Sequence, residues 1–141
     1  METVELSKRF MSYWETSDWE SFDDLLDENV KLELTWLDII INSKENIKKV
    51  FGENSKDEPN QIFKIDQIIG NSKYTMVNCS STRKAGIFGS PNFDLIKGNE
   101  IEGFEFSLVL EWEQYKLVRM CLNDCSVLTS EEVMKEWIEK I

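Results

Sequence analysis

An aspartate ends an alternating apolar pattern near the end of this 141-residue sequence. The pattern predicts two half-buried strands in a hairpin, since residues two apart share a face of a strand. On the first strand one face carries Phe104, Phe106, Leu108, Leu110 and Trp112. On the second strand one face carries Val118, Met120, Leu122 and then Asp124. A carboxylate in an apolar site has a raised pKa and can act as an acid or base near neutral pH. The alternative is that Asp124 ends the strand and caps the next turn.

The turn of the hairpin decides which face of the second strand points inward. A two-residue turn at Glu113–Gln114 would pair Trp112 with Tyr115 and turn Arg119, Cys121 and Asn123 inward. A three-residue loop with a bulge, or an equivalent odd offset, pairs Trp112 with Lys116 and turns Met120, Leu122 and Asp124 inward. We favour the second arrangement because its inward set is uniformly apolar up to the aspartate.

Two further side chains are candidates for catalysis beside Asp124. Asp38 continues the parity of the apolar residues in strand 29–36, although a turn at residues 37–38 would break that parity. Tyr13, on a predicted helix, could donate its hydroxyl proton to a substrate oxygen. The structural alternatives are a surface aspartate and a core aromatic residue.

Composition excludes several classes of function. The chain has no histidine, which removes Ser-His-Asp triads, Cys-His pairs and His-ligated metal sites. A net charge of −11 without a basic stripe argues against nucleic acid and anionic membranes as partners. Three cysteines, an odd number, indicate reduced thiols, and no signal segment or apolar run long enough to span a bilayer occurs, so we expect a cytoplasmic protein. We expect no metal and no cofactor.

The periodicity predicts one α+β domain over residues 1–141. We expect helices at 3–16, at 18–27 after a capping box from Ser17 to Glu20, and after an Asn42 cap. We expect strands at 29–36, 61–69, 74–84, 101–112 and 115–125, loops at 54–60 and 85–93, and a short C-terminal helix opened by Thr129. Helices first and strands later favour a curved antiparallel sheet wrapped on the N-terminal helices, with the hairpin 101–125 at its centre.

The order of these segments resembles the nuclear-transport-factor-2-like superfamily, in its SnoaL-like, polyketide-cyclase-like branch. The matching segments are SDWESFDDLLDENVKLEL, NSKENIKKVF and LEWEQYKLVRMCLND, the last with Tyr115 where the family has a turn glycine. A helix-grip fold is the main rival, but it begins with a strand. The resemblance departs at the chemistry of ketosteroid isomerases, because the family's helix tyrosine falls at Phe10 and its general base falls near Leu34.

The resemblance implies a cone with an apolar cavity and, often, a homodimer through the convex sheet face. We expect the cavity to be lined by Phe10, Trp14, Trp36, Phe63, Met76, Asn78, Phe106, Leu108, Met120 and Leu122. The expected ligand is a small apolar or aromatic molecule, and cofactor-free cyclase, isomerase or dehydratase chemistry is one reading. The alternative is a non-catalytic module for dimerisation or partner binding. Outward residues Val109, Leu117 and Cys121 suggest a dimer face, and Ile87 and Phe88 suggest a lid or an ordinary hairpin turn.

Overall fold

The computed structural model describes residues 2–34, 39–57, 62–81, 94–97 and 100–123. The predicted C-terminal helix, the 85–93 loop with Ile87 and Phe88, and the candidates Trp36, Asp38 and Asp124 lie outside these residues. No helix in the described ranges is long and apolar enough to cross a membrane.

The first two helices form where the 3.6-residue periodicity predicts them. Helix α1 runs over Glu2–Thr16 and buries a face that includes Leu6, Phe10 and Trp14. Helix α2 runs over Trp19–Leu25, shorter than the predicted 18–27. Its N-cap is Asp18 and not Ser17, since Asp18 Oδ1 accepts from the Ser21 N–H at 3.2 Å. Ser17 takes a left-handed backbone conformation between the helices, with φ of 58°.

Helix α3 extends over Lys44–Asp57, into the stretch predicted as a loop. Ser43 opens it instead of the predicted Asn42, because Ser43 Oγ accepts from the Asn46 N–H at 3.3 Å. Its buried side chains include Ile47 and Phe51.

Seven strands form one mixed sheet in the described part of the chain. The strands are β1 (Leu26–Leu34), β2 (Ile39–Asn42), β3 (Phe63–Gly70), β4 (Tyr74–Ser81), β5 (Asp94–Lys97), β6 (Glu100–Glu113) and β7 (Lys116–Asn123). Their order is β2-β1-β7-β6-β4-β3, with β5 paired to β6, so the β6–β7 hairpin is central as predicted. Strands β2 and β5 were not predicted.

One strand pair corrects the expectation of a wholly antiparallel sheet. Strand β1 pairs with β7 in parallel, with Leu32 opposite Met120 and Leu34 opposite Leu122. The remaining pairs are antiparallel. Since β1 and β7 belong to distant parts of the chain, no hairpin forces them to be antiparallel.

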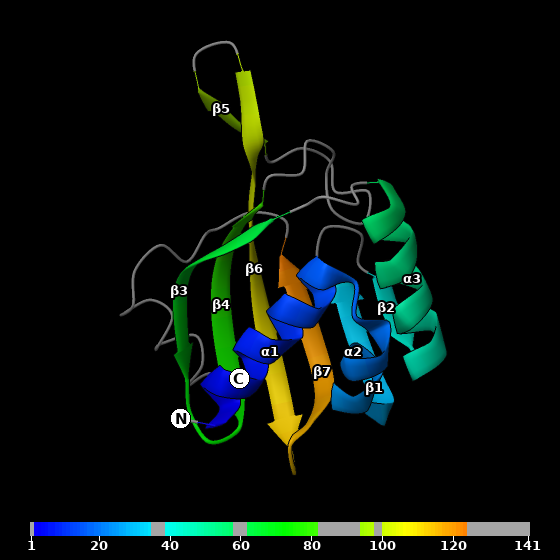
Figure 1. Ribbon diagram of the computed structural model, residues 1–141. Helices are drawn as coiled ribbons and strands as arrows, with labels where there is room; N and C mark the ends of the chain where they lie inside the picture. Colours follow the sequence, from blue (N-terminus) through cyan, green and yellow to red (C-terminus); the bar gives the residue numbers. More distant parts are fainter. Residues whose placement is uncertain (1, 35–38, 58–61, 82–93, 98–99, 124–141) are drawn as a thin grey trace.

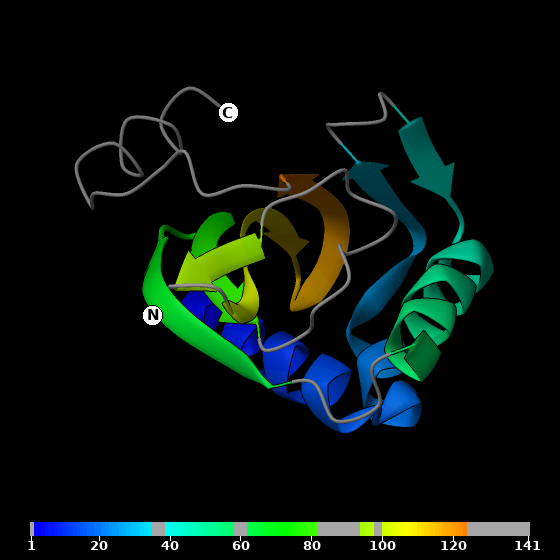
Figure 2. The same cartoon turned by 90° about the horizontal axis from the view of Figure 1, so that it is seen from above.

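The helices lie on one side of the curved sheet (Figure 1), and the strands form an arc over α1 and α2 when seen from above (Figure 2). The main core fills the space between these helices and the concave face of the sheet. The expected α+β architecture, a curved sheet wrapped on N-terminal helices, is therefore confirmed, with one parallel strand pair where only antiparallel pairs were expected.

Candidate functional site

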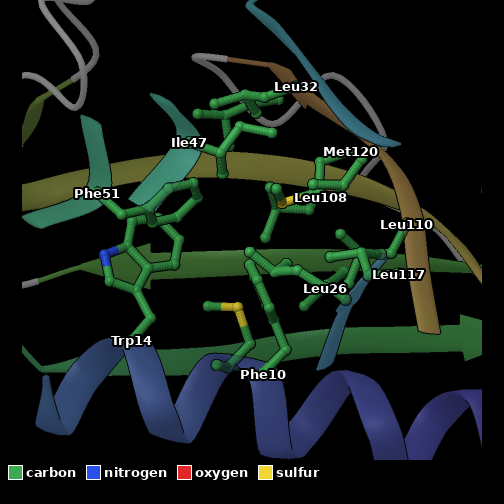
Figure 3. Close-up of a cluster of buried hydrophobic side chains, with 14 of the residues drawn as sticks. Phe10, Trp14, Leu26, Leu32, Ile47, Phe51, Leu108, Leu110, Leu117 and Met120 are labelled. Carbon is green, nitrogen blue, oxygen red and sulfur yellow. The ribbon is translucent and has the colours of Figure 1, made fainter. Parts of the chain in front are cut away.

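The concave side of the sheet holds a cluster of buried side chains, here called the interior cluster. Phe10 and Trp14 point from α1 toward strand residues such as Leu108, Leu110 and Met120 (Figure 3). Inward residues of four strands and all three described helices meet here, so this cluster is the centre of the fold.

Aromatic rings fill much of this space. The Trp14 ring centroid lies 4.7 Å from that of Phe51 and 4.5 Å from that of Phe63. The Phe106 ring contacts both Trp14, at 5.8 Å, and Phe63, at 5.7 Å. Such tilted and edge-on contacts between rings are typical of a packed core.

Most of the predicted cavity-lining residues belong to this cluster. The fully buried ones are Phe10, Trp14, Phe106, Leu108, Met120 and Leu122. Phe63 and Tyr13 are half-buried and pack against it. They are brought together as predicted, but they contact one another as core residues.

Met76 and Asn78 were predicted on the wrong face. Met76 packs with Val109 on the opposite, outer side of the sheet, and the inward residues of β4 are Val77 and Cys79. The sequence did not decide this, because both parities of β4 carry apolar residues.

The hairpin turn differs in detail from the predicted one but gives the favoured inward face. Gln114 and Tyr115 form a two-residue turn, so Glu113 pairs with Lys116 and Trp112 with Leu117. A bulge follows, after which Glu111 pairs with Arg119 and Leu110 with Met120. The extra residue restores the parity that turns Met120 and Leu122 inward.

The same bulge changes the faces at the start of β7. Leu117 is fully buried in the interior cluster, not outward as predicted, and Val118, predicted inward, is half-buried and lies outside that cluster. Cys121 is outward as predicted.

The outer face carries a row of polar side chains that the sequence analysis did not identify. Ser107 Oγ donates to Asn78 Oδ1 at 2.6 Å, and Asn78 Nδ2 donates to Gln67 Oε1 at 3.2 Å. These residues are cross-strand neighbours on β3, β4 and β6, and Ser107 and Asn78 are buried. The sequence signal that could have revealed this row is that each of the three polar residues falls among the outward-facing positions of its strand.

Among the residues whose side-chain burial is described, the buried polar ones are Thr3, Ser7, Thr75, Asn78 and Ser107, and none of them is a carboxylate. The charged groups among these residues lie toward the surface. On the outer face the Arg119 guanidinium donates to both oxygens of Glu33, at 3.0 and 3.1 Å, which raises the pKa of Arg119.

The thiols described here are protonated at neutral pH. Burial raises the pKa of the Cys121 thiol to about 11, and burial raises that of Cys79 well above its ordinary value. Neither is therefore an activated nucleophile. No group of three or more Cys, Asp or Glu side chains in the described ranges could hold a metal ion.

No protein-family model matches the sequence, and no curated protein is significantly similar to it. Solved structures, however, share its fold. A proposed SnoaL-like polyketide cyclase from Shewanella putrefaciens superimposes with a TM-score of 0.68 at 9% identity, over 100% of this chain and 88% of its own. A proposed ketosteroid isomerase from Kribbella flavida gives 0.64 at 16% identity, over 85% of this chain and 75% of its own.

A SnoaL-like protein of unknown function from Burkholderia thailandensis gives a TM-score of 0.65 at 9% identity, over 84% of this chain and 91% of its own. These superpositions establish a shared fold, and at such low sequence identity a shared fold does not identify an activity. The chain has the nuclear-transport-factor-2-like fold that SnoaL-like proteins share, and the resemblance read in the sequence is confirmed at the level of the fold.

Proposed function

We propose that this protein binds a small, apolar, ring-containing molecule where β7 ends, with Asp124 as an acid or base. The observation that carries the proposal is the inward orientation of Met120 and Leu122. Asp124 follows Asn123, the last residue of β7, and shares the parity of these two residues in the sequence. If the strand continued for one more residue, the Asp124 carboxylate would point toward the interior cluster.

The surroundings of the last inward residues suit an apolar ligand. Leu122 lies opposite Leu108 on β6 and opposite Leu34 on β1. Trp14, Phe63 and Phe106 lie in the same cluster and offer aromatic surface. Trp36 would add a further aromatic ring to this surface.

The chemistry would be proton transfer without a cofactor. A carboxyl group beside apolar side chains prefers its neutral form, so its pKa rises toward neutrality. Such a group can protonate an oxygen or remove a proton from carbon next to a carbonyl, the step shared by isomerases, cyclases and dehydratases. Asp38 or Tyr13 would polarise the substrate oxygen.

The names of two structural neighbours support the substrate class. One is a proposed polyketide cyclase, a name that denotes ring formation, and the other a proposed ketosteroid isomerase, a name that denotes a ring-containing substrate. Ketosteroid-isomerase chemistry itself needs other residues here, since Phe10 and Leu34 are apolar core residues.

A second candidate function is a non-catalytic module for dimerisation or partner binding. It is favoured by the close packing of Phe10, Trp14, Phe51 and Phe106 inside the cone. The outer face of the sheet would form the interface. Val109, however, is only 5% exposed in the single chain, so its apolar side chain does not require a partner. Light scattering over a range of concentrations tests this candidate, because a monomer throughout would contradict it.

Titration of Asp124 by carboxyl NMR tests the first candidate without a known substrate. We expect a pKa above about 3.9, the usual value for aspartate. A normal or lowered pKa would contradict the proposal. Once a panel of cyclic ketones and enones yields a substrate, Asp124→Asn should reduce turnover about 10²–10⁴-fold and change binding less. Asp24→Asn is the matched control, because Asp24 is an exposed carboxylate on α2.

A further inference from the structure

The β3–β4 and β6–β7 turns lie at the same end of the sheet (Figure 1). Together with the first residues of α1 they line a separate pocket. We call it the turn-side pocket. Its volume is about 430 Å³. It is lined by Glu2, Thr3 and Leu6 of α1, Ser72 of the β3–β4 turn, and Trp112, Gln114 and Tyr115 of the β6–β7 hairpin. The interior-cluster residues proposed to bind the ring-containing molecule do not line it.

Hydrogen bonds hold the three walls of this pocket together. Thr3 Oγ1 donates to the Asn71 carbonyl at 2.6 Å, which links α1 to the β3–β4 turn. Trp112 Nε1 donates to Ser7 Oγ at 3.2 Å, and the Trp112 N–H donates to the Lys73 carbonyl at 2.7 Å. A site whose walls are already in place loses little entropy when a ligand binds.

The turn that forms one rim has an uncommon backbone. Gln114 and Tyr115 both have positive φ, at 49° and 66°, where hairpin turns favour Asn-Gly or Gly-Gly. Tyr115 is also 62% exposed, although it is a large aromatic residue. A strained, exposed aromatic side chain at the rim of a pocket is a reason to look for a ligand that uses its ring.

Charge indicates the kind of ligand. Among the described residues Glu2 is the one charged side chain that lines the pocket, and the sequence as a whole carries a net charge of −11. The Tyr115 hydroxyl donates to Glu2 Oε1 at 3.3 Å, so ring and carboxylate are adjacent. A carboxylate that accepts one hydrogen bond still attracts a nearby cation through its charge. Leu6 and Trp112 are almost fully buried and form an apolar floor.

We propose that the turn-side pocket binds a small organic cation of the alkylated-ammonium class. The cation would lie against the Tyr115 ring, with its charge balanced by Glu2 and its alkyl groups on Leu6 and Trp112. Aromatic rings attract ammonium groups through their negative faces, and alkylated ammonium ions are the ligands best suited to this contact. An anion would be repelled by Glu2. This site is independent of the function proposed for Asp124.

The test uses choline and its uncharged carbon analogue, 3,3-dimethylbutan-1-ol, as probes for the full-length chain. The readout is the NMR signal of the Trp112 indole N–H, with the Trp14 indole as an internal reference for the interior cluster. We expect choline to shift the Trp112 signal in a saturable way and the neutral analogue to bind at least about five-fold more weakly. Absence of saturation, equal binding of the two probes, or a shift confined to Trp14 would overturn the proposal.

Variants identify the groups that bind. Glu2→Gln and Tyr115→Leu should each weaken choline binding about three- to five-fold, and Tyr115→Phe, which keeps the ring, should change it less than about two-fold. Glu113→Gln is the matched control, because Glu113 is an exposed carboxylate next to the same turn that does not line the pocket. All three positions are exposed on the surface, so the four variants are expected to fold. Equal weakening by Glu2→Gln and Glu113→Gln would indicate general charge attraction and overturn the assignment.

Discussion

Leu108 of β6 lies directly opposite Leu122 of β7, and both side chains are fully buried in the interior cluster. The alternation of inward and outward residues in the central hairpin therefore continues to Leu122, two positions before Asp124. Strand β7 has an inward and an outward set of residues, and their contributions to stability can be compared.

Replacing an inward residue of β7 should destabilise the protein much more than replacing its outward neighbour. We expect Leu122→Ala to lower the free energy of unfolding by about 2–5 kcal/mol, because it leaves a cavity in a packed core. Cys121→Ala, at a half-exposed outward position, should cost less than about 1 kcal/mol. Urea denaturation of the two variants measures both values, and similar losses would contradict the assigned faces.

The polar row on the outer face should act as a connected network. Asn78→Ala removes the acceptor of Ser107 and the donor to Gln67 in a buried site, so we expect a loss of about 1–3 kcal/mol. Ser107→Ala should cost less, since one hydrogen bond is removed. A double-mutant cycle should give a coupling of at least about 0.5 kcal/mol, and additive losses would argue against the network.

Asp23 should make stability depend on pH at acidic values. Its pKa is lowered, mainly because its carboxylate accepts a hydrogen bond from Lys48 at 2.7 Å, with a further contribution from Lys44. A lowered pKa in the folded state means that the carboxylate stabilises the fold above its unfolded pKa of about 3.9. This contribution is lost as the pH falls through the folded pKa.

The difference in stability between the native protein and Asp23→Asn should therefore shrink as the pH decreases from about 6 to about 3. The effect is expected to be small because the ion pair is near the surface. Urea midpoints at several pH values measure it, with Asp24→Asn as the control. A difference that grows on acidification would contradict the assigned pairing.

Tyr115→Gly should stabilise the fold while removing the ring from the turn-side pocket. Glycine adopts positive φ without the steric cost of a Cβ atom, a cost of about 1–2 kcal/mol for other residues. Part of this gain is offset because glycine is more flexible in the unfolded chain, so we expect a net gain of about 1 kcal/mol or less. Thermal unfolding measures the change, and a clear loss of stability would show that the Tyr115 side chain holds the hairpin together.

Periodicity was sufficient to predict the faces of the long elements. The spacing of Leu6, Phe10 and Trp14 gave helix α1 and its buried side. Alternation gave the inward sets of β1 and β6 and, beyond the bulge, the inward residues Met120 and Leu122 of β7. These patterns succeed because one face of each element is apolar and the other is polar. Strand β4 lacks this contrast, with Met76 on one face and Val77 on the other, and there the prediction was wrong.

Partners and turns were harder to predict than faces. Alternation shows which side of a strand is buried but not which strand lies beside it, so the parallel pair of β1 and β7 could not be found this way. The turn at Gln114–Tyr115 has none of the residues that favour positive φ, so the sequence did not predict its position. The sequence also did not predict the turn-side pocket, because the pocket forms where this turn, the β3–β4 turn and α1 meet in space.

The parallel pairing of β1 with β7 has a consequence for the order of folding. Arg119 and Glu33, which join the two strands on the outer face, are 86 positions apart in the sequence. One neighbour of β1 in the sheet is β2, which follows it directly in the chain. The other neighbour is β7, which is the last described strand to be synthesised. Until β7 is made, the apolar side of β1 lacks the strand that covers its other edge, and the growing chain exposes part of its core. Contacts so distant in sequence slow folding, so we expect this domain to fold more slowly than a helical protein of equal length and to be prone to aggregation while it does.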